Sequence, residues 1–269
     1  MLTTMSADGT QVRATDQGQG PVILILHPGL DDGRSWDRVA ARLAVRFRVV
    51  RPHRRRYRLD LTGDPPCSIA QEAADAVAVA VAVAVGEPVL LVGHSSGAVV
   101  ALEALVASPS AFSGAALYEP PVVIGPPMGG GTHAVERARV AVAAGRPGRA
   151  MAIFLRDIVQ LHPLEARLAG TLVAIDRRLR ALAPRQIDDA AAINELGVRL
   201  DAYAAIDVPV VLLGGDRSPA HLGGRLDALA AVLPHAERVV LHGQGHDAHR
   251  DAPEEVARVV ETLADKVLR

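Results

Sequence analysis

Short runs of apolar residues recur along the chain and alternate with segments of helical patterning. Six runs are typical of buried strands: Pro21–Leu26, Phe47–Val50, Val89–Val92, Ala115–Tyr118, Val208–Leu213 and Arg238–Leu241. A strand that helices cover on both faces is apolar throughout rather than at every second residue. Five segments favour helices: Ser35–Val45, Ile69–Val85, Ala98–Ala107, Leu222–Leu233 and Pro253–Leu268. This alternation predicts an α/β fold, with a mostly parallel central sheet flanked by helices.

One of these helical segments carries a conflicting pattern. Residues Ala76–Val85 alternate alanine with valine, which taken alone is the period of a strand. We nevertheless predict a helix there, because alanine is the best helix former and because a crossover between parallel strands requires a helix.

The alternation of strands and helices stops after the fourth apolar run. The following residues contain helical segments near Arg149–Leu161 and Leu164–Leu182, with Pro147 and Pro163 as first-turn residues. No strand pattern occurs there, so we expect a helical insertion that covers the sheet's catalytic edge. The predicted organisation is a first core segment, a helical cap and a second core segment: 1–121, 122–205 and 206–269.

Composition narrows the classes of partner. The chain has 269 residues, 49% hydrophobic content and a net charge of −1, so no overall field attracts nucleic acid or an anionic membrane. The single cysteine, Cys67, excludes an intramolecular disulfide and a Cys-rich metal site. Residues Met1–Asp8 lack the basic and apolar regions of a signal peptide. We therefore expect a cytoplasmic protein with neither a membrane nor a nucleic acid as its partner.

The third apolar run leads directly into the pentapeptide Gly93-His94-Ser95-Ser96-Gly97. In a Gly-x-Ser-x-Gly turn between a strand and a helix, the backbone is strained. The residues two positions before and after the serine come very close to neighbouring backbone, so only small residues fit there. Such a turn projects the Ser95 hydroxyl above the sheet. The Ser96 amide opens the next helix and points toward the place where a negative oxygen would form. We predict Ser95 as a nucleophile and Ser96 as an oxyanion donor.

A serine nucleophile needs a base, and the base needs an acid to orient it. His246 follows the last predicted strand in a glycine-rich loop, which allows the loop to deliver an imidazole over the sheet edge. Asp216 follows the fifth predicted strand through two glycines, and Glu119 follows the fourth. We predict His246 as the base and Asp216 as the acid, because this gives the chain order Ser, Asp, His. Glu119 is the alternative acid.

A second oxyanion donor is expected in the loop after Leu26, where the chain reads His27-Pro28-Gly29-Leu30. Proline has no N–H group, so Pro28 cannot donate a hydrogen bond. The amide of Gly29 or Leu30 is therefore the candidate. Gly29 would also allow a substrate to approach the backbone closely.

These motifs together resemble the α/β-hydrolase superfamily over essentially the full length of the chain. The resemblance is carried by His27-Pro28-Gly29, Ser35-Trp36, Phe47–Pro52, Gly93–Gly97, Gly214-Gly215-Asp216, Gly245-His246 and Ala252–Glu255. It implies the α/β-hydrolase fold and the triad Ser95, Asp216 and His246, with a helical cap over the pocket.

The sequence departs from the family pattern at two places. Pro28 stands where the family usually has glycine, and residues His53–Arg58 replace a stretch that typically reads Asp-Arg-Arg-Gly-His/Tyr-Gly. These departures indicate an altered loop at the side of the pocket. We interpret the basic run Arg51–Arg58 as a solvated loop, since most charge runs are solvated, with binding of a phosphate or an acidic carrier protein as the alternative.

The histidines near the end of the chain carry a second possible interpretation. His242, His246 and His249 have a spacing that could suggest a metal site, but Gly243 and Gly245 disfavour the helix that such a spacing needs. We therefore predict no metal at these residues.

The sequence as a whole predicts a serine hydrolase that acts on a small-molecule substrate without a cofactor. The predicted reaction is cleavage of an ester, lactone or thioester of a small to medium apolar acid through an acyl-enzyme intermediate. Two alternatives stay open: the same triad used for carbon–carbon bond hydrolysis or a biosynthetic step, and a non-catalytic binding protein on this fold.

Overall fold

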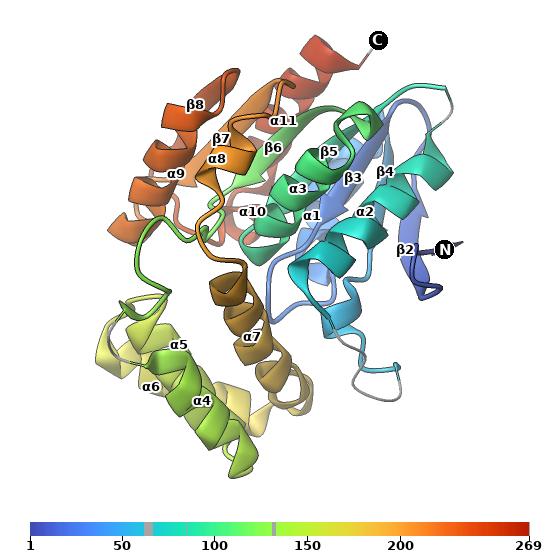
Figure 1. Ribbon diagram of the computed structural model, residues 1–269. Helices are drawn as coiled ribbons and strands as arrows, with labels where there is room; N and C mark the ends of the chain where they lie inside the picture. Colours follow the sequence, from blue (N-terminus) through green and yellow to red (C-terminus); the bar gives the residue numbers. More distant parts are fainter. Residues whose placement is uncertain (62–66, 85, 131–132, 269) are drawn as a thin grey trace.

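The computed structural model describes residues 1–61, 67–84, 86–130 and 133–268 and contains an eight-stranded sheet (Figure 1). Its strands are β1 (Leu2–Met5), β2 (Gln11–Gln17), β3 (Val22–Leu26), β4 (Arg48–Pro52), β5 (Val89–His94), β6 (Phe112–Tyr118), β7 (Val210–Gly215) and β8 (Ala236–Leu241). The order across the sheet is β1-β2-β4-β3-β5-β6-β7-β8. The first two pairings are antiparallel and the others parallel, which confirms the predicted fold class.

Helices cover both faces of this sheet. The helices of the described residues are α1 (Asp37–Leu43), α2 (Ile69–Val83), α3 (Ser96–Ala107), α4 (Ala134–Ala143), α5 (Pro147–Asp157), α6 (Pro163–Ile175), α7 (Arg177–Leu196), α8 (Leu200–Tyr203), α9 (Ala220–Val232), α10 (Ala248–Asp251) and α11 (Pro253–Val267). Short 3₁₀ turns lie at η1 (Arg34–Trp36), η2 (Arg55–Tyr57) and η3 (Pro109–Ala111). One buried cluster joins the sheet to α2, α3 and α9, and another joins it to α1 and α11. In the described part of the chain, every helix is too short or too polar to cross a membrane.

Two local differences from the sequence prediction have simple physical causes. The antiparallel strands β1 and β2 were not predicted, because β2 buries only alternate residues, Val12 and Ala14, and so lacks a continuous apolar run. The alanine–valine segment is helical, as predicted, and begins with a capping box in which the Ser68 side chain accepts from the Gln71 amide. Its predicted last residue, Val85, lies outside the described residues.

Among the described residues between β6 and β7, helices α4 to α7 form what we call the helical insertion, and the short α8 follows them. Pro147 and Pro163 occupy the first turns of α5 and α6, as their positions predicted. A helix break at Asp176 divides the predicted segment Leu164–Leu182, because the Asp176 side chain caps α7 by accepting from the Leu179 amide. The insertion has its own buried cluster, and α7 also contacts α2, α3 and η2 of the core. In Figure 1, α7 lies between the core and the other three helices.

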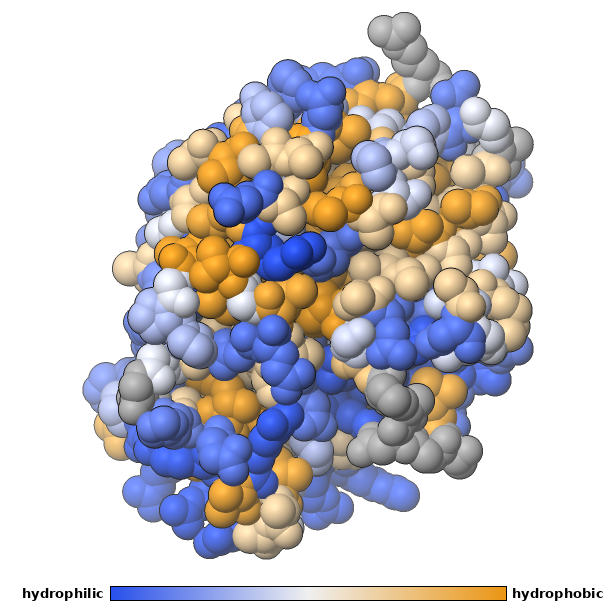
Figure 2. All heavy atoms as spheres, in the orientation of Figure 1, coloured by the Kyte–Doolittle hydropathy of each residue, from blue (hydrophilic) through white to orange (hydrophobic). Residues whose placement is uncertain are grey.

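The surface differs between the two parts. On the face drawn in Figure 2, hydrophilic residues gather over the helical insertion, whereas apolar residues are more frequent over α3, α8 and α9.

Inside the insertion, α5 and α6 cross at two glycines. A Cβ atom on Gly170 would lie 2.5 Å from the Gly148 carbonyl oxygen, so the two backbones are in direct contact there.

This crossing predicts opposite effects for two glycine-to-alanine changes. Gly170→Ala should lower the free energy of unfolding by about 1–3 kcal/mol, because the added methyl group forces α5 and α6 apart. Gly223→Ala is the matched control, because it lies in α9 with open space around it. It should raise the same quantity by about 0.5–1 kcal/mol through its higher helix propensity. Urea unfolding measures both, and equal effects would contradict the close crossing.

Candidate active site

The turn from β5 into α3 has the geometry that the pentapeptide predicts. Ser95 adopts φ 53° and ψ −126°, a strained conformation for a residue with a side chain, and its amide donates to the Tyr118 carbonyl at 2.8 Å. A Cβ atom on Gly97 would lie 2.4 Å from the His27 carbonyl oxygen, and one on Gly93 would lie 2.6 Å from the Ala98 Cα. Both glycines are therefore sterically required, because neighbouring backbone occupies the space of their side chains.

Parallel pairing brings several candidate residues to one edge of the sheet. His94 at the end of β5 pairs with Tyr118 at the end of β6, and Tyr118 pairs with Leu213 near the end of β7. Ser95 and Glu119 directly follow the first two of these positions. Because parallel strands end at a common edge, side chains that are distant in sequence converge there.

His246 forms its close contact with Glu119. The Nδ1 atom of His246 lies 2.5 Å from Glu119 Oε2, and the Glu119 side chain is only 1% exposed. The other carboxylate oxygen, Oε1, accepts from the Gly215 amide at 2.8 Å. The Glu119 carboxylate is thus fixed at both oxygens, and it orients His246 with Nε2 free to face another group.

The prediction that Asp216 orients His246 is wrong for this structure. The Asp216 side chain is 42% exposed, and its Oδ2 lies 3.1 Å from His242 Nδ1. Its Oδ1 accepts from the Gly243 amide at 2.7 Å, and these two contacts lower the pKa of Asp216 from its ordinary value. Asp216 therefore holds the start of the loop that carries His246, while the alternative acid, Glu119, contacts the histidine itself.

The two glycines before Asp216 lie where the chain is closely packed. A Cβ atom on Gly214 would lie 2.7 Å from Leu226 Cδ1 and 3.3 Å from Glu119 Oε1, and one on Gly215 would lie 2.2 Å from the Gln244 carbonyl oxygen. Side chains at these positions would crowd α9, the Glu119 carboxylate and the histidine loop.

Aromatic rings place His246 beside the nucleophile turn. The His246 ring lies 4.7 Å from that of His94, the residue before Ser95, and 5.9 Å from that of Tyr118. The Tyr118 hydroxyl in turn hydrogen-bonds the Gly245 carbonyl oxygen and accepts from the Ala248 amide at 3.1 Å. The loop around His246 is therefore anchored to the strand whose last carbonyl holds the Ser95 amide.

The predicted oxyanion donors lie on two segments next to this turn. Ser96 is the first residue of α3, where helix amides have no acceptor within the helix. Leu30 has a positive φ of 54° and packs against the buried cluster of the insertion. A Cβ atom on Gly29 would lie 1.9 Å from Gln186 Oε1 of α7, so the loop Gly29–Leu30 is pressed directly against the insertion.

His27 stabilises the same loop as a neutral imidazole. Burial and the nearby Arg54 lower the pKa of His27 to about 4. Its Nδ1 lies 2.8 Å from the Pro28 carbonyl oxygen, and its Nε2 accepts from the Arg54 amide at 3.2 Å. These two contacts fix the tautomer with the proton on Nδ1.

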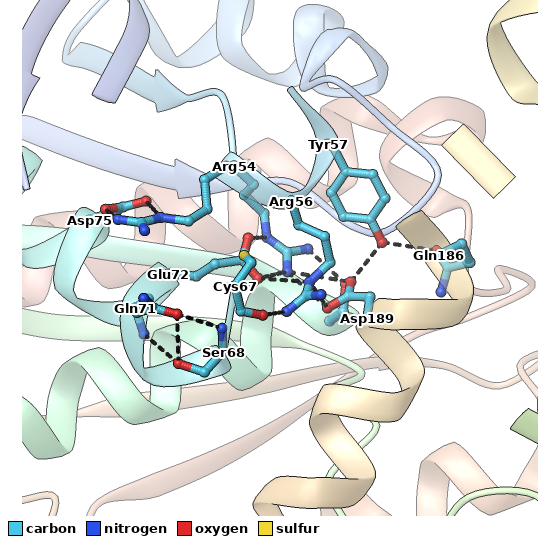
Figure 3. Close-up of polar contacts among 12 residues, drawn as sticks. Arg54, Arg56, Tyr57, Cys67, Ser68, Gln71, Glu72, Asp75, Gln186 and Asp189 are labelled. Atoms are coloured by element: carbon cyan, nitrogen blue, oxygen red, sulfur yellow. Dashed lines mark hydrogen bonds and ion pairs between the residues drawn. The ribbon is translucent and has the colours of Figure 1, made fainter. Parts of the chain in front are cut away.

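The basic run is buried, so its interpretation as a solvated loop is wrong. Five of its arginines are between 4% and 7% exposed: Arg51, Arg54, Arg55, Arg56 and Arg58. Figure 3 shows Arg54 and Arg56 converging on Glu72 of α2 and Asp189 of α7. The Tyr57 hydroxyl reaches the same Asp189 carboxylate at 2.7 Å. We call these five residues, Arg54, Arg56, Tyr57, Glu72 and Asp189, the buried ion cluster.

The sequence contains a signal for this cluster. Glu72 and Asp75 lie three residues apart in a largely apolar helix, and both are buried. Carboxylates are rarely buried without a partner. Two of them in such a helix therefore indicate cations nearby, and a dense run of arginines precedes that helix.

The histidines considered as a metal site have separate environments. His242 lies beside Asp216 and His246 beside Glu119, whereas His249 is fully buried and stacks on Trp36 with a ring separation of 5.4 Å. Neither ring nitrogen of His249 has a hydrogen-bond partner among the described residues.

The burial of His249 predicts a loss of stability in acid. Burial lowers the pKa of His249 to about 4 from an ordinary value of 6.5. The folded state therefore binds fewer protons than the unfolded state between these values, and stability falls as the pH drops through this window. His249→Phe keeps a ring stacked on Trp36. The decrease in the free energy of unfolding between pH 7 and pH 5 should therefore be about 2 kcal/mol smaller in this variant than in the wild type. Urea unfolding at both pH values measures it, and an unchanged pH dependence would contradict the assignment.

Comparisons with known proteins identify the family and the fold. The family model described as the alpha/beta hydrolase family matches residues 23–259. An alpha/beta hydrolase from Sphaerobacter thermophilus is 28% identical, with a TM-score of 0.82 over 97% of this chain and 100% of that chain. A thermophilic esterase from Thermogutta terrifontis is 18% identical, with a TM-score of 0.78 over 100% of this chain and 99% of that chain. An enzyme described as degrading N-acyl homoserine lactones is 21% identical, with a TM-score of 0.74 over 96% of this chain and 99% of that chain. With its strained serine turn, its histidine loop and this match across most of its length, the chain belongs to the alpha/beta hydrolase family.

Proposed function

We propose that the protein is a serine hydrolase whose triad is Ser95, His246 and Glu119. One observation carries the proposal: the buried Glu119 carboxylate lies 2.5 Å from His246 Nδ1, next to a serine held in a strained turn. A histidine that is anchored through Nδ1 presents Nε2 as a general base, which is what a serine nucleophile requires. The family match supports hydrolase activity, and the triad residues supply a chemical route to it.

The mechanism follows from the positions of these groups. His246 takes the proton of the Ser95 hydroxyl, and the serine oxygen attacks the substrate carbonyl carbon. The resulting negative oxygen accepts hydrogen bonds from the Ser96 amide and from the amide of Gly29 or Leu30. His246 then gives its proton to the leaving group, and water releases the acyl group from Ser95 by the reverse sequence of steps.

The proposed substrates are esters, lactones or thioesters of small to medium apolar acids. Solved structures that share this fold include an esterase and a lactone-degrading enzyme, and this mechanism requires only an acyl carbonyl and a leaving group. The helical insertion packs against the loop Gly29–Leu30, and this contact supports the proposal that it forms a cap over the acyl site. No step in this mechanism uses a cofactor.

The nucleophile is tested by covalent labelling. A fluorophosphonate probe should label the wild-type protein at Ser95, because the activated hydroxyl attacks phosphorus as it attacks a carbonyl carbon. Ser95→Ala should abolish labelling and lower kcat/KM on p-nitrophenyl esters by at least about 10⁴-fold. Peptide mass spectrometry identifies the labelled residue. A folded protein labelled elsewhere, or an active Ser95→Ala variant, would refute the proposal.

The acid is tested by two isosteric amide substitutions. Glu119→Gln should lower kcat by about 10³–10⁴-fold, because an amide cannot stabilise the imidazolium that forms during the reaction. Asp216→Asn is the matched control and should retain most of the wild-type kcat, since Asp216 contacts the loop rather than His246. Steady-state kinetics on one ester substrate compares them. The reverse ranking of the two variants would assign the acid to Asp216.

A further inference from the structure

We propose that Asp189 is a positioning residue for the oxyanion hole, acting through the buried ion cluster on both donor segments. The inference rests on the proposed function and goes beyond it, because Asp189 lies on α7 of the helical insertion and belongs to neither the triad nor the hole. Its side chain is completely buried, and it contacts the core through two separate arms.

The first arm leads from Asp189 to Ser96. One terminal nitrogen of Arg54, Nη2, lies 3.2 Å and 3.3 Å from the two Asp189 carboxylate oxygens. The other, Nη1, donates to the Ser96 hydroxyl oxygen at 2.8 Å. The guanidinium group is planar and rigid, so its two terminal nitrogens hold Asp189 and Ser96 in a fixed relative position. Asp189 therefore fixes the side chain of the residue whose amide is the first oxyanion donor.

The second arm leads from Asp189 to the loop that carries Gly29. The Tyr57 hydroxyl lies 2.7 Å from Asp189 Oδ2 and 3.2 Å from Gln186 Oε1. Burial raises the pKa of Tyr57 well above its usual value, so the hydroxyl keeps its proton and donates a hydrogen bond to the charged carboxylate of Asp189. Tyr57 and Gln186 both press on Gly29, where a Cβ atom would lie 2.8 Å from the Tyr57 hydroxyl. The second donor segment thus lies directly against both side chains.

A contact between Arg54 and His27 joins the two arms. Arg54 Nη1 donates to the His27 carbonyl oxygen at 3.3 Å, two residues before Gly29. The same carbonyl oxygen is the atom nearest to a Cβ on Gly97, in the nucleophile turn. One guanidinium group therefore contacts both sides of the proposed hole, and Asp189 fixes its orientation.

The charges show why Asp189 is needed as an anion. Burial would raise the pKa of Asp189, but Arg54 and Arg56 outweigh it and hold the pKa below its ordinary value. With Glu72, the cluster holds two positive and two negative charges, so it is balanced. Such a cluster adds little net stability compared with well-packed apolar residues of similar volume. What it does provide is a fixed geometry, and an oxyanion hole depends on geometry because a misplacement of about 1 Å costs about 10²-fold in rate.

The test compares Asp189→Asn with Glu103→Gln. Glu103 is a matched control, because it is also a buried carboxylate that pairs with an arginine, Arg199. Glu103 lies on the part of α3 that is farther from Ser95. Asp189→Asn should lower kcat by about 10²-fold with little change in KM, because ground-state binding does not use the oxyanion donors. Affinity for a trifluoromethyl ketone, whose adduct places a negative oxygen in the hole, should fall in parallel. Glu103→Gln should lower Tm without changing either quantity.

Two milder variants keep the charges balanced in case Asp189→Asn does not fold. Tyr57→Phe removes only the hydroxyl of the second arm, and Ser96→Ala removes only the side chain of the first arm while keeping its amide. Each should lower kcat and inhibitor affinity by about tenfold, with the pH profile of kcat unchanged because His246 and Glu119 are not altered. A lower Tm with wild-type kcat in all three variants would reduce the cluster to a structural cross-link and overturn the inference.

Ser95→Ala, measured in parallel, separates this inference from the proposed function. If Ser95→Ala stays active, the proposed function fails together with the inference. If Ser95→Ala is inactive while Asp189→Asn turns over at the wild-type rate, only the role of Asp189 is refuted.

Discussion

The carboxylate of Glu119 is the contact around which the rest of the site is arranged. It follows β6, lies beside the end of β7 and reaches the loop after β8, so it joins three consecutive parts of the sheet edge. Burial of this group is tolerable because both oxygens are hydrogen-bonded, one by the Gly215 amide and the other by His246. The loop that carries His246 is held in place by contacts with Tyr118 and Asp216 and packs closely against Gly215.

A second set of buried charges connects the insertion to the core. Arg54 and Asp189 are 135 positions apart in the chain, yet they meet where α7 of the insertion packs against η2, α2 and α3 of the core. Four buried charges are costly unless each has partners, and the observed pairing supplies them. The same contacts end at Ser96 and at the loop of Gly29, so the packing of the insertion and the shape of the proposed oxyanion hole depend on each other.

The sequence predicted the elements whose signals are local. Continuous apolar runs predicted the parallel strands because helices cover both faces of these strands. The two glycines beside Ser95 predicted the strained turn. The antiparallel strands β1 and β2 were not predicted because β2 buries only alternate residues and no residue of β1 is fully buried. The choice between Glu119 and Asp216 could not be made from the chain order, since both follow parallel strands at the same edge. That choice depends on which carboxylate meets the His246 ring, which only the folded structure reveals.

A crystal structure of the protein after reaction with a fluorophosphonate would show whether Ser95, His246 and Glu119 act together. Joint action predicts phosphorus bonded to the Ser95 oxygen, with His246 still paired to Glu119. It also predicts a phosphonyl oxygen within hydrogen-bond distance of the Ser96 amide and of the Gly29 or Leu30 amide. An adduct on another residue, or a His246 side chain turned to Asp216 in the adduct, would contradict the claim.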